Sequence, residues 1–255
     1  MPKEMSRVLM EVDYEKAERA YLRRLPLEHF MESTPQATQR EITLESLALV
    51  KAQRPEVQVF NELLVQYPIE GRRKLGQVVP DNMIVLHPEP LKTKGSYNTP
   101  LQPALPFCTL EYVSPGNERK DYVISMNKYE HELKVPYYLM FVPDSQEMTL
   151  YRHNGTKYVS VPPDERGRYA IPELELEVGL HGGWMRYWFR GELLPLPAEL
   201  QAELQKERRE LQKERRELQK ERRELQKERT ARLAVEEENA RLRAELEQLR
   251  RSRAD

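Results

Sequence analysis

Two acidic residues inside apolar runs are the residues of this sequence best suited to chemistry. Asp81 follows Pro80 in VVPDNMIVL, and Glu111 lies in LPFCTLEYVS. Both runs are typical of β-strands, in which acids are disfavoured, and a buried unpaired carboxylate is costly. Two such acids on neighbouring strands would be useful at a divalent cation, because Mg²⁺ takes one or two carboxylates together with water and phosphate oxygens. The pattern therefore predicts metal-assisted phosphodiester hydrolysis.

The same two acids also have a simpler explanation. Pro-Asp commonly opens a turn, and an acid at the end of a strand is often solvated. Other site chemistry is poorly supported, because the sequence has no glycine-rich phosphate loop, and its histidines lack the spacing of metal ligands. These scattered histidines are His29, His87, His131, His153 and His181.

Composition favours one medium-sized globular domain with an appendage. The chain has 255 residues and a net charge of −1, charged residues make up 33% of it, and the excess over an ordinary globular protein lies mostly after Leu200. Near-zero net charge argues against a protein that coats nucleic acid in general. Cys108, the single cysteine, lies in an apolar run, which indicates a buried, inert thiol and no intrachain disulfide. The chain shows neither a secretory segment nor an apolar run of membrane-spanning length, so we expect a cytoplasmic protein with no membrane partner.

The order of the expected elements predicts a mixed α/β sheet with helices on its faces. Helices are expected at residues 14–25 and 38–54, and a strand with a bulge at Asn61-Glu62 at residues 57–69. A loop of nearly twenty residues, 87–106, separates the strands that contain Asp81 and Glu111. A helix within residues 114–134 then joins the strand of Glu111 to a buried strand, VPYYLMFVP, which predicts two parallel strands. Asn154-Gly155 predicts a hairpin with a two-residue turn.

The C-terminal tail has a different pattern, in which the heptad LQKERRE recurs from Leu204. Only residues 235–249 have apolar residues at both core positions of a coiled coil, whereas the earlier heptads offer one leucine each. A helix from Pro197 to about Arg250 would be roughly 80 Å long. Both a solvated spacer and an oligomerisation coil fit this pattern, so a homodimer could form through the distal coil or through the globular domain.

From about Glu18 to Pro197 the chain resembles the putative restriction endonuclease family of the PD-(D/E)XK nuclease superfamily. The resemblance rests on the order and spacing of QVVPDNMIVL, LEYVSP, KDYVISMNKYEHELKVPYYLMFVP and TLYRHNGTKY. It implies a restriction-endonuclease-like core, a central mixed sheet flanked by helices, which we assign to residues 1–196. The heptad pattern assigns residues 197–255 to a charged heptad-repeat helix or coiled coil. The resemblance also implies that Asp81 and Glu111 bind Mg²⁺ or Mn²⁺ and that the partner is DNA.

The lysine of the superfamily is missing from this sequence. The superfamily places it two residues after the second acid, where this chain has Val113. Many relatives instead show S-P and then D-x3-K-x3-Y, and the position of the lysine in that pattern is Ser125. We predict Lys128, three residues further along the helix, as a substitute catalytic residue; a solvated lysine paired with Glu132 is the simpler alternative. The remaining matches to that pattern are Ser114, Pro115, Asp121 and Tyr129.

Two functions are compatible with these residues. The first is a metal-dependent DNA endonuclease that uses Asp81, Glu111 and Lys128, with Glu32, Gln39 or Glu62 as residues that could complete the site. The alternative is a catalytically inactive nuclease-fold protein that binds or scaffolds, with the tail as a helical spacer, because a fold does not imply an activity.

Overall fold

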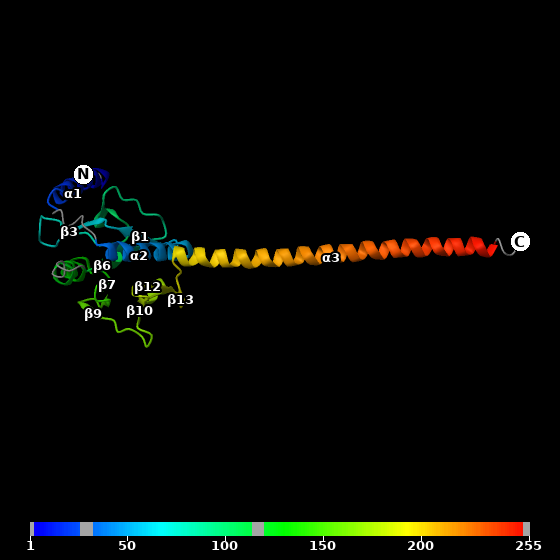
Figure 1. The fold of residues 1–255 in the computed structure, drawn as a ribbon. Helices are drawn as coiled ribbons and strands as arrows, with labels where there is room; N and C mark the ends of the chain where they lie inside the picture. Colours follow the sequence, from blue (N-terminus) through cyan, green and yellow to red (C-terminus); the bar gives the residue numbers. More distant parts are fainter. Residues whose placement is uncertain (1–2, 26–32, 114–119, 252–255) are drawn as a thin grey trace. The chain divides into compact units, whose positions relative to one another are not determined.

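The computed structural model describes residues 3–25, 33–113 and 120–251. The chain divides into two compact units, Met1–Leu196 and Pro197–Asp255. The first unit has helices on a set of sheets, and the second is a single long helix, α3 (Pro197–Arg251) (Figure 1).

A six-stranded mixed sheet forms the centre of the first unit. Its strands, in spatial order, are β1 (Val57–Asn61), β4 (Asn82–Leu86), β6 (Pro106–Tyr112), β7 (Tyr137–Val142), β8 (Glu147–His153) and β9 (Tyr158–Ser160). β6 and β7 pair in parallel, and every other neighbouring pair in this sheet is antiparallel. The parallel pair is the one predicted around the helical connection, and the predicted mixed α/β architecture is confirmed.

Each face of this sheet carries its own apolar cluster, because successive side chains of a strand point to opposite faces. One cluster combines Ile84 and Leu110 with helix α2 (Thr34–Gln53) and a four-stranded sheet. The other combines Met83 with the segment around Tyr129 and a three-stranded sheet. Apolar layers therefore cover both faces of β4 and β6, and Cys108 is fully buried as predicted.

Two smaller antiparallel or mixed sheets supply these covering layers. The four-stranded sheet consists of β10 (Arg168–Ile171), β11 (Leu176–His181), β12 (Trp184–Phe189) and β13 (Glu192–Leu193). The three-stranded sheet consists, in spatial order, of β3 (Gly76–Val78), β2 (Leu64–Tyr67) and β5 (Ser96–Asn98). Short 3-10 turns lie at Thr99–Leu101 and Pro172–Leu174.

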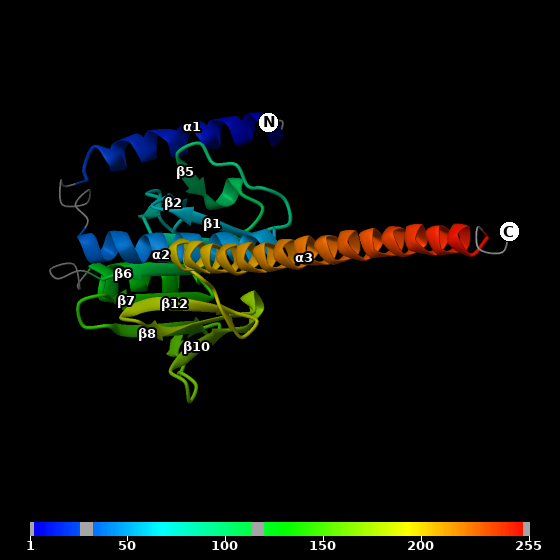
Figure 2. The same ribbon diagram turned by 45° about the vertical axis from the view of Figure 1, so that its right-hand side comes forward.

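Helix α2 begins four residues before the predicted residue 38, at a capping signal, and ends close to the predicted residue 54. The Ser33 hydroxyl accepts a hydrogen bond from the Gln36 amide, and the Gln36 side chain bonds back to the Ser33 amide, which forms a capping box. The helix ends before Pro55, with the Arg54 amide donating to the Val50 carbonyl. α2 packs against β1 and β12 (Figure 2). The first helix, α1 (Lys3–Leu22), begins earlier than the predicted residue 14.

Three local predictions were wrong in detail. Residues 57–69 form two strands in different sheets instead of one bulged strand; the chain turns at Glu62, whose φ of +47° is in the left-handed region. The long loop contains β5, which pairs in parallel with β2. The predicted hairpin of β8 and β9 is present, but its loop is four residues long, because His153 pairs with Tyr158.

The helical segment after β6 is largely π-helical instead of α-helical. The π-helical turns span Lys120–Ser125 (η3) and Lys128–Leu133 (η4). A π-helix bonds residue i to i+5, so side-chain positions inferred from the α-helical repeat do not hold in this segment. Such turns occur frequently at functional sites.

Helix α3 is continuous over the predicted range. Its described side chains, up to residue 242, are almost all exposed, and Leu204 to Leu225 of the repeats are at least half exposed. Each heptad carries a single leucine among charged residues, so this part of the helix has no broad apolar face to bury. Among the helices that the structure describes, none combines the length and the apolar character needed to cross a membrane.

Candidate functional site

Three neighbouring strands of the central sheet place acidic residues at the same end. β4 is antiparallel to both β1 and β6, so β4 begins where β1 and β6 end. Asn82 is paired with Leu110, the last pair at this end, and one more step of this register would set Asp81 opposite Glu111. Opposite residues of an antiparallel pair lie on the same face of a sheet. Glu62 follows the last residue of β1, and its amide donates to the Asp81 carbonyl at 3.1 Å.

The Asp81 carboxylate is fixed by the backbone of the neighbouring strand. Its Oδ2 accepts a hydrogen bond from the Tyr112 amide at 2.6 Å. Asp81 is half-buried and lies in a bend immediately before β4, so the predicted strand acid is at a strand end. A hydrogen bond from an amide favours the charged form of a carboxylate.

Glu111, by contrast, is buried within β6, with 1% of its surface exposed. Its Oε1 accepts a hydrogen bond from the Tyr129 hydroxyl at 2.7 Å. Burial, and then the charge of Glu111, raises the pKa of Tyr129 well above its ordinary value, with a smaller contribution from the charge of Asp81. The two acids therefore lie close enough to one phenol for both charges to act on it.

One face of α2 covers the end of β6. Gln36 donates to the Tyr112 carbonyl at 2.9 Å, and Thr43 accepts from the Tyr112 hydroxyl at 2.7 Å. The same hydroxyl lies 2.5 Å from Asn82 Oδ1. Residues seven apart lie on the same face of an α-helix, and position 40 lies on that face between them. The face is therefore held against Tyr112 at both ends.

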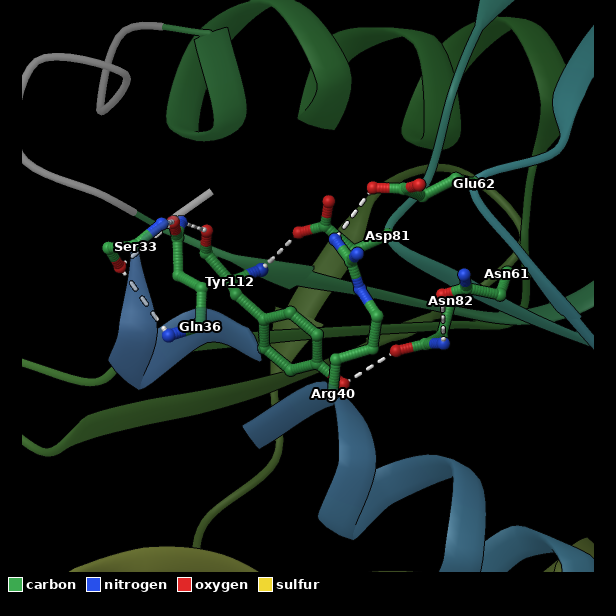
Figure 3. Close-up of polar contacts among 8 residues, drawn as sticks. All are labelled: Ser33, Gln36, Arg40, Asn61, Glu62, Asp81, Asn82 and Tyr112. Atoms are coloured by element: carbon green, nitrogen blue, oxygen red, sulfur yellow. Dashed lines mark hydrogen bonds and ion pairs between the residues drawn. The ribbon is translucent and has the colours of Figure 1, made fainter. Parts of the chain in front are cut away.

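Arg40 extends from this face to the acidic end of the strands. Its Nη2 lies 2.7 Å from Oε1 of Glu62, and only 17% of its side chain is exposed. Figure 3 shows the guanidinium group pointing into the space between the carboxylates of Glu62 and Asp81. The charge of Arg40 lowers the pKa of Tyr112, whereas burial, the largest cause, and the charge of Asp81 raise it. A cation from α2 therefore lies among the acids.

The positions considered for the missing lysine have definite surroundings. Val113 belongs to the apolar cluster that contains Met83, and 1% of its surface is exposed. Ser125 is 2% exposed. The Lys128 ammonium donates to the Gln77 carbonyl at 2.7 Å. Glu132, its simpler predicted partner, accepts a hydrogen bond from the Tyr67 hydroxyl at 2.5 Å.

The residues named as possible additions to the site differ in their surroundings. Gln39 is fully buried and bonds to both the amide and the carbonyl of Met185 in β12. Glu62 lies next to Asp81, as described above. Glu32 lies outside the described residues, as do Ser114 and Pro115 of the family pattern.

Sequence reasoning missed Arg40. The available signal was a run of polar residues, Gln36, Arg40 and Thr43, on the face of α2 that also carries the buried Leu47 and Val50. Polar residues on the buried face of a helix need partners, so such a run points to a polar contact below the helix.

The donor set suits a hard divalent cation held by two carboxylates. Within the residues that the structure describes, no group of three or more histidine, cysteine, aspartate and glutamate side chains is placed to hold a metal ion. Mg²⁺ does not require such a group, because it commonly keeps several waters and binds one or two carboxylates together with the phosphates of its substrate. The paired positions of Asp81 and Glu111 are compatible with that mode of binding.

A family model agrees with the sequence resemblance. The family Uma2, described as "Putative restriction endonuclease", matches residues 29–186. A solved structure described as a putative nuclease belonging to DUF820 from Anabaena variabilis is 16% identical, with a TM-score of 0.42, and the match covers 56% of this chain and 75% of that one. No curated protein matches the sequence. Because the family match spans more than half of the chain and includes both acids of the site, this protein belongs to the Uma2 family of putative restriction endonucleases.

Proposed function

We propose that this chain is a metal-dependent DNA endonuclease in which Asp81 and Glu111 hold a divalent cation, Mg²⁺ or Mn²⁺. The observation that carries the proposal is the register of β4 and β6, which pairs Asn82 with Leu110 and, continued by one step, would set the two acids opposite each other at one end of the sheet. Membership in a family of putative nucleases supports hydrolysis of a phosphodiester. A cation bound there would supply a water of lowered pKa and would stabilise the charge that develops on the phosphate.

The chain's own residues keep both acids ready to bind a cation. The Tyr112 amide orients Asp81, and the Tyr129 hydroxyl orients Glu111. Hydrogen bonds of this kind favour the ionised carboxylate. Like any tyrosine, Tyr129 is protonated and can donate at neutral pH, and burial raises its pKa further, so it stays a donor in alkaline solution as well. Partners that orient ligands in this way typically change metal affinity by about 10- to 100-fold.

Lys128 is retained in the proposal as a residue that assists. It adjoins Tyr129 in the π-helical turn η4, and its ammonium is a donor of three hydrogen bonds. One of them goes to the Gln77 carbonyl. Its positive charge would offset phosphate charge, which is the role of the lysine in the superfamily pattern.

A catalytically inactive, nuclease-fold binding or scaffold protein is the second candidate. The observation that favours it is Val113, which fills the position of the usual lysine with a buried apolar side chain. This candidate predicts that DNA is bound without being cut, and that Asp81 and Glu111 do not bind metal.

Cleavage and metal binding, measured together, test the proposal. Supercoiled plasmid is incubated with the full chain and Mg²⁺ or Mn²⁺, and Mn²⁺ binding is measured by calorimetry. We expect nicking and binding by the wild type, loss of both in Asp81→Asn, and no change in Asp144→Asn, which alters an exposed acid distant in sequence. Metal binding that persists in Asp81→Asn would reject this assignment, and a wild type that neither binds metal nor cuts would favour the second candidate.

A further inference from the structure

The candidate site gathers negative charge, and its substrate is negative as well. Glu62, Asp81 and Glu111 lie at one end of three strands. A phosphate that approaches them is repelled unless a positive charge compensates, and a pair of unit charges at 4 Å interacts by about 4 kcal/mol near a protein surface. Val113 is apolar, so the residue that occupies the usual lysine position has no charge to offer.

Arg40 is the described cation with the most direct placement among these acids. Its guanidinium contacts Glu62 at 2.7 Å and points toward Asp81 (Figure 3). Its charge and that of Asp81 act in opposite directions on the pKa of Tyr112, which places both near the same side chain. Arginine binds phosphate oxygens through two parallel hydrogen bonds, for which its planar group is suited.

The backbone below Arg40 is held in place, which distinguishes it from an ordinary surface arginine. Gln36, one turn before it, and Thr43, almost one turn after it, both bond to Tyr112. Tyr112 is in turn bonded to Asp81 and adjoins Glu111. The position of the guanidinium is therefore fixed relative to both acids through a single residue of β6.

We propose that Arg40 is the phosphate-binding cation of this site and supplies from α2 the positive charge that Val113, directly after β6, cannot supply. The inference rests on the proposed nuclease function. A guanidinium stays protonated throughout the accessible pH range, so Arg40 takes no proton from the attacking water. Its role is to bind phosphate oxygens and to stabilise their charge. Without nucleic acid, the same group offsets the charges of Glu62 and Asp81.

The first test measures nucleic-acid binding in the absence of metal, so that it does not depend on cleavage. Fluorescence anisotropy with a labelled duplex oligonucleotide is recorded over a range of salt concentrations for the wild type, Arg40→Gln and Arg40→Lys. We expect Arg40→Gln to weaken binding on the order of ten-fold and to lower the slope of log K against log salt by about one. Arg40→Lys should recover part of the affinity. Lys51→Gln, an exposed cation on the same helix, should change neither quantity.

A second variant distinguishes the loss of a phosphate contact from misfolding as the cause of weaker binding. Glu62→Gln removes the carboxylate that engages Arg40 and retains a side chain of similar size. It should strengthen oligonucleotide binding, an effect opposite in sign to that of Arg40→Gln and not explained by loss of structure. Calorimetry should also show tighter Mn²⁺ binding in Arg40→Gln, by several-fold, because the competing cation between the acids is gone.

The outcomes separate this inference from the proposed function. A wild type that does not cut DNA contradicts the nuclease proposal, while the opposite effects of Arg40→Gln and Glu62→Gln on oligonucleotide binding would still support the assignment of Arg40. Cleavage by the wild type, together with unchanged oligonucleotide binding and salt dependence in folded Arg40→Gln, overturns the assignment and leaves the nuclease proposal standing.

Discussion

Charged residues have contrasting surroundings in two regions of the molecule. One region is the place where β4 begins and β6 ends, and the other is the surface of α3. At the end of the strands, Glu111 is 1% exposed and its partner Tyr129 comes from another element. Along α3, Arg232 pairs with Glu236 one turn away, and their side chains are 81% and 60% exposed. A buried charge needs a partner placed by the tertiary structure, whereas a solvated charge needs none.

The difference teaches where a change of charge should matter. Exposed pairs within one helix contribute about 0.3–0.5 kcal/mol, because water screens them and competes for them. Removal of one member of a buried, hydrogen-bonded pair leaves the other without its partner, which costs several times more. The two regions therefore allow a matched comparison within one chain. Substitution of a buried glutamate should affect function, and substitution of an exposed glutamate should not.

The largest expected effect is on metal affinity. Glu111→Gln should weaken Mn²⁺ binding by more than about 100-fold, since it removes a proposed ligand. Glu228→Gln, the same change on the exposed surface of α3, should leave binding unaltered. Calorimetric titration of both variants measures the contrast. Equal affinities would remove Glu111 from the site and abolish the functional difference between the two regions.

Alkaline pH should destabilise the first unit through its buried phenols. Burial raises the pKa of Tyr112, Tyr129 and Tyr187 above the ordinary value of about 10. Because the folded-state pKa is the higher one, the stabilising contribution is complete below pH 10 and is lost as the pH rises toward the folded-state values. The free energy of unfolding should fall by up to about 4 kcal/mol per pH unit above pH 10 for these three residues. Urea unfolding at pH 9 to 11 measures it; a flat profile would show that these phenols ionise in the folded state.

A smaller effect is expected when the partner of Glu111 is removed. Tyr129→Phe deletes the hydroxyl that donates to Oε1 and should lower the free energy of unfolding by about 2 kcal/mol at neutral pH. Tyr151→Phe, a change of the same chemistry at a partly buried residue of the central sheet, is the control and should cost less than about 1 kcal/mol. Urea unfolding compares the two. Equal costs would mean that the Tyr129 hydroxyl does not stabilise the buried acid.

The smallest effect on folding is expected from the end of α3. A truncation after Arg229 should change the free energy of unfolding of the first unit by less than about 0.5 kcal/mol, since exposed helix surface contributes little to a separate core. We also expect any self-association to depend on residues 235–249, because the preceding heptads offer only one apolar residue each. Analytical ultracentrifugation of both chains gives their masses. A truncated chain that associates as strongly as the full one would place a dimer interface elsewhere.

Much of the fold could be predicted because its signals are local. Pro55 gives the end of α2, and the apolar composition of residues 137–142 gives a buried strand. The repeat from Leu204 gives one long helix. In each case, neighbours in the sequence satisfy the backbone hydrogen bonds or fix the periodicity, so the sequence pattern carries the information.

The π-helical turns and the split at Glu62 were not predictable in the same way. A segment with a helical sequence pattern has the same composition whether its backbone hydrogen bonds span four residues or five. Residues 57–69 are rich in strand formers throughout, and only their distribution between two sheets requires the turn at Glu62. Packing against the rest of the first unit decides both features.

The sequence by itself determined which two acids are unusual, Asp81 and Glu111, because a carboxylate inside a strand-forming run is costly wherever the strand lies. Only the tertiary structure decided what surrounds them. Antiparallel pairing set Asn82 and Leu110, the neighbours of the two acids, opposite each other. β6 gave Asp81 the Tyr112 amide, and α2 brought Arg40 beside Asp81 from 41 positions earlier in the chain. Strand register and helix packing are properties of contacts between distant segments, and no local pattern specifies the partner that a buried charge will find.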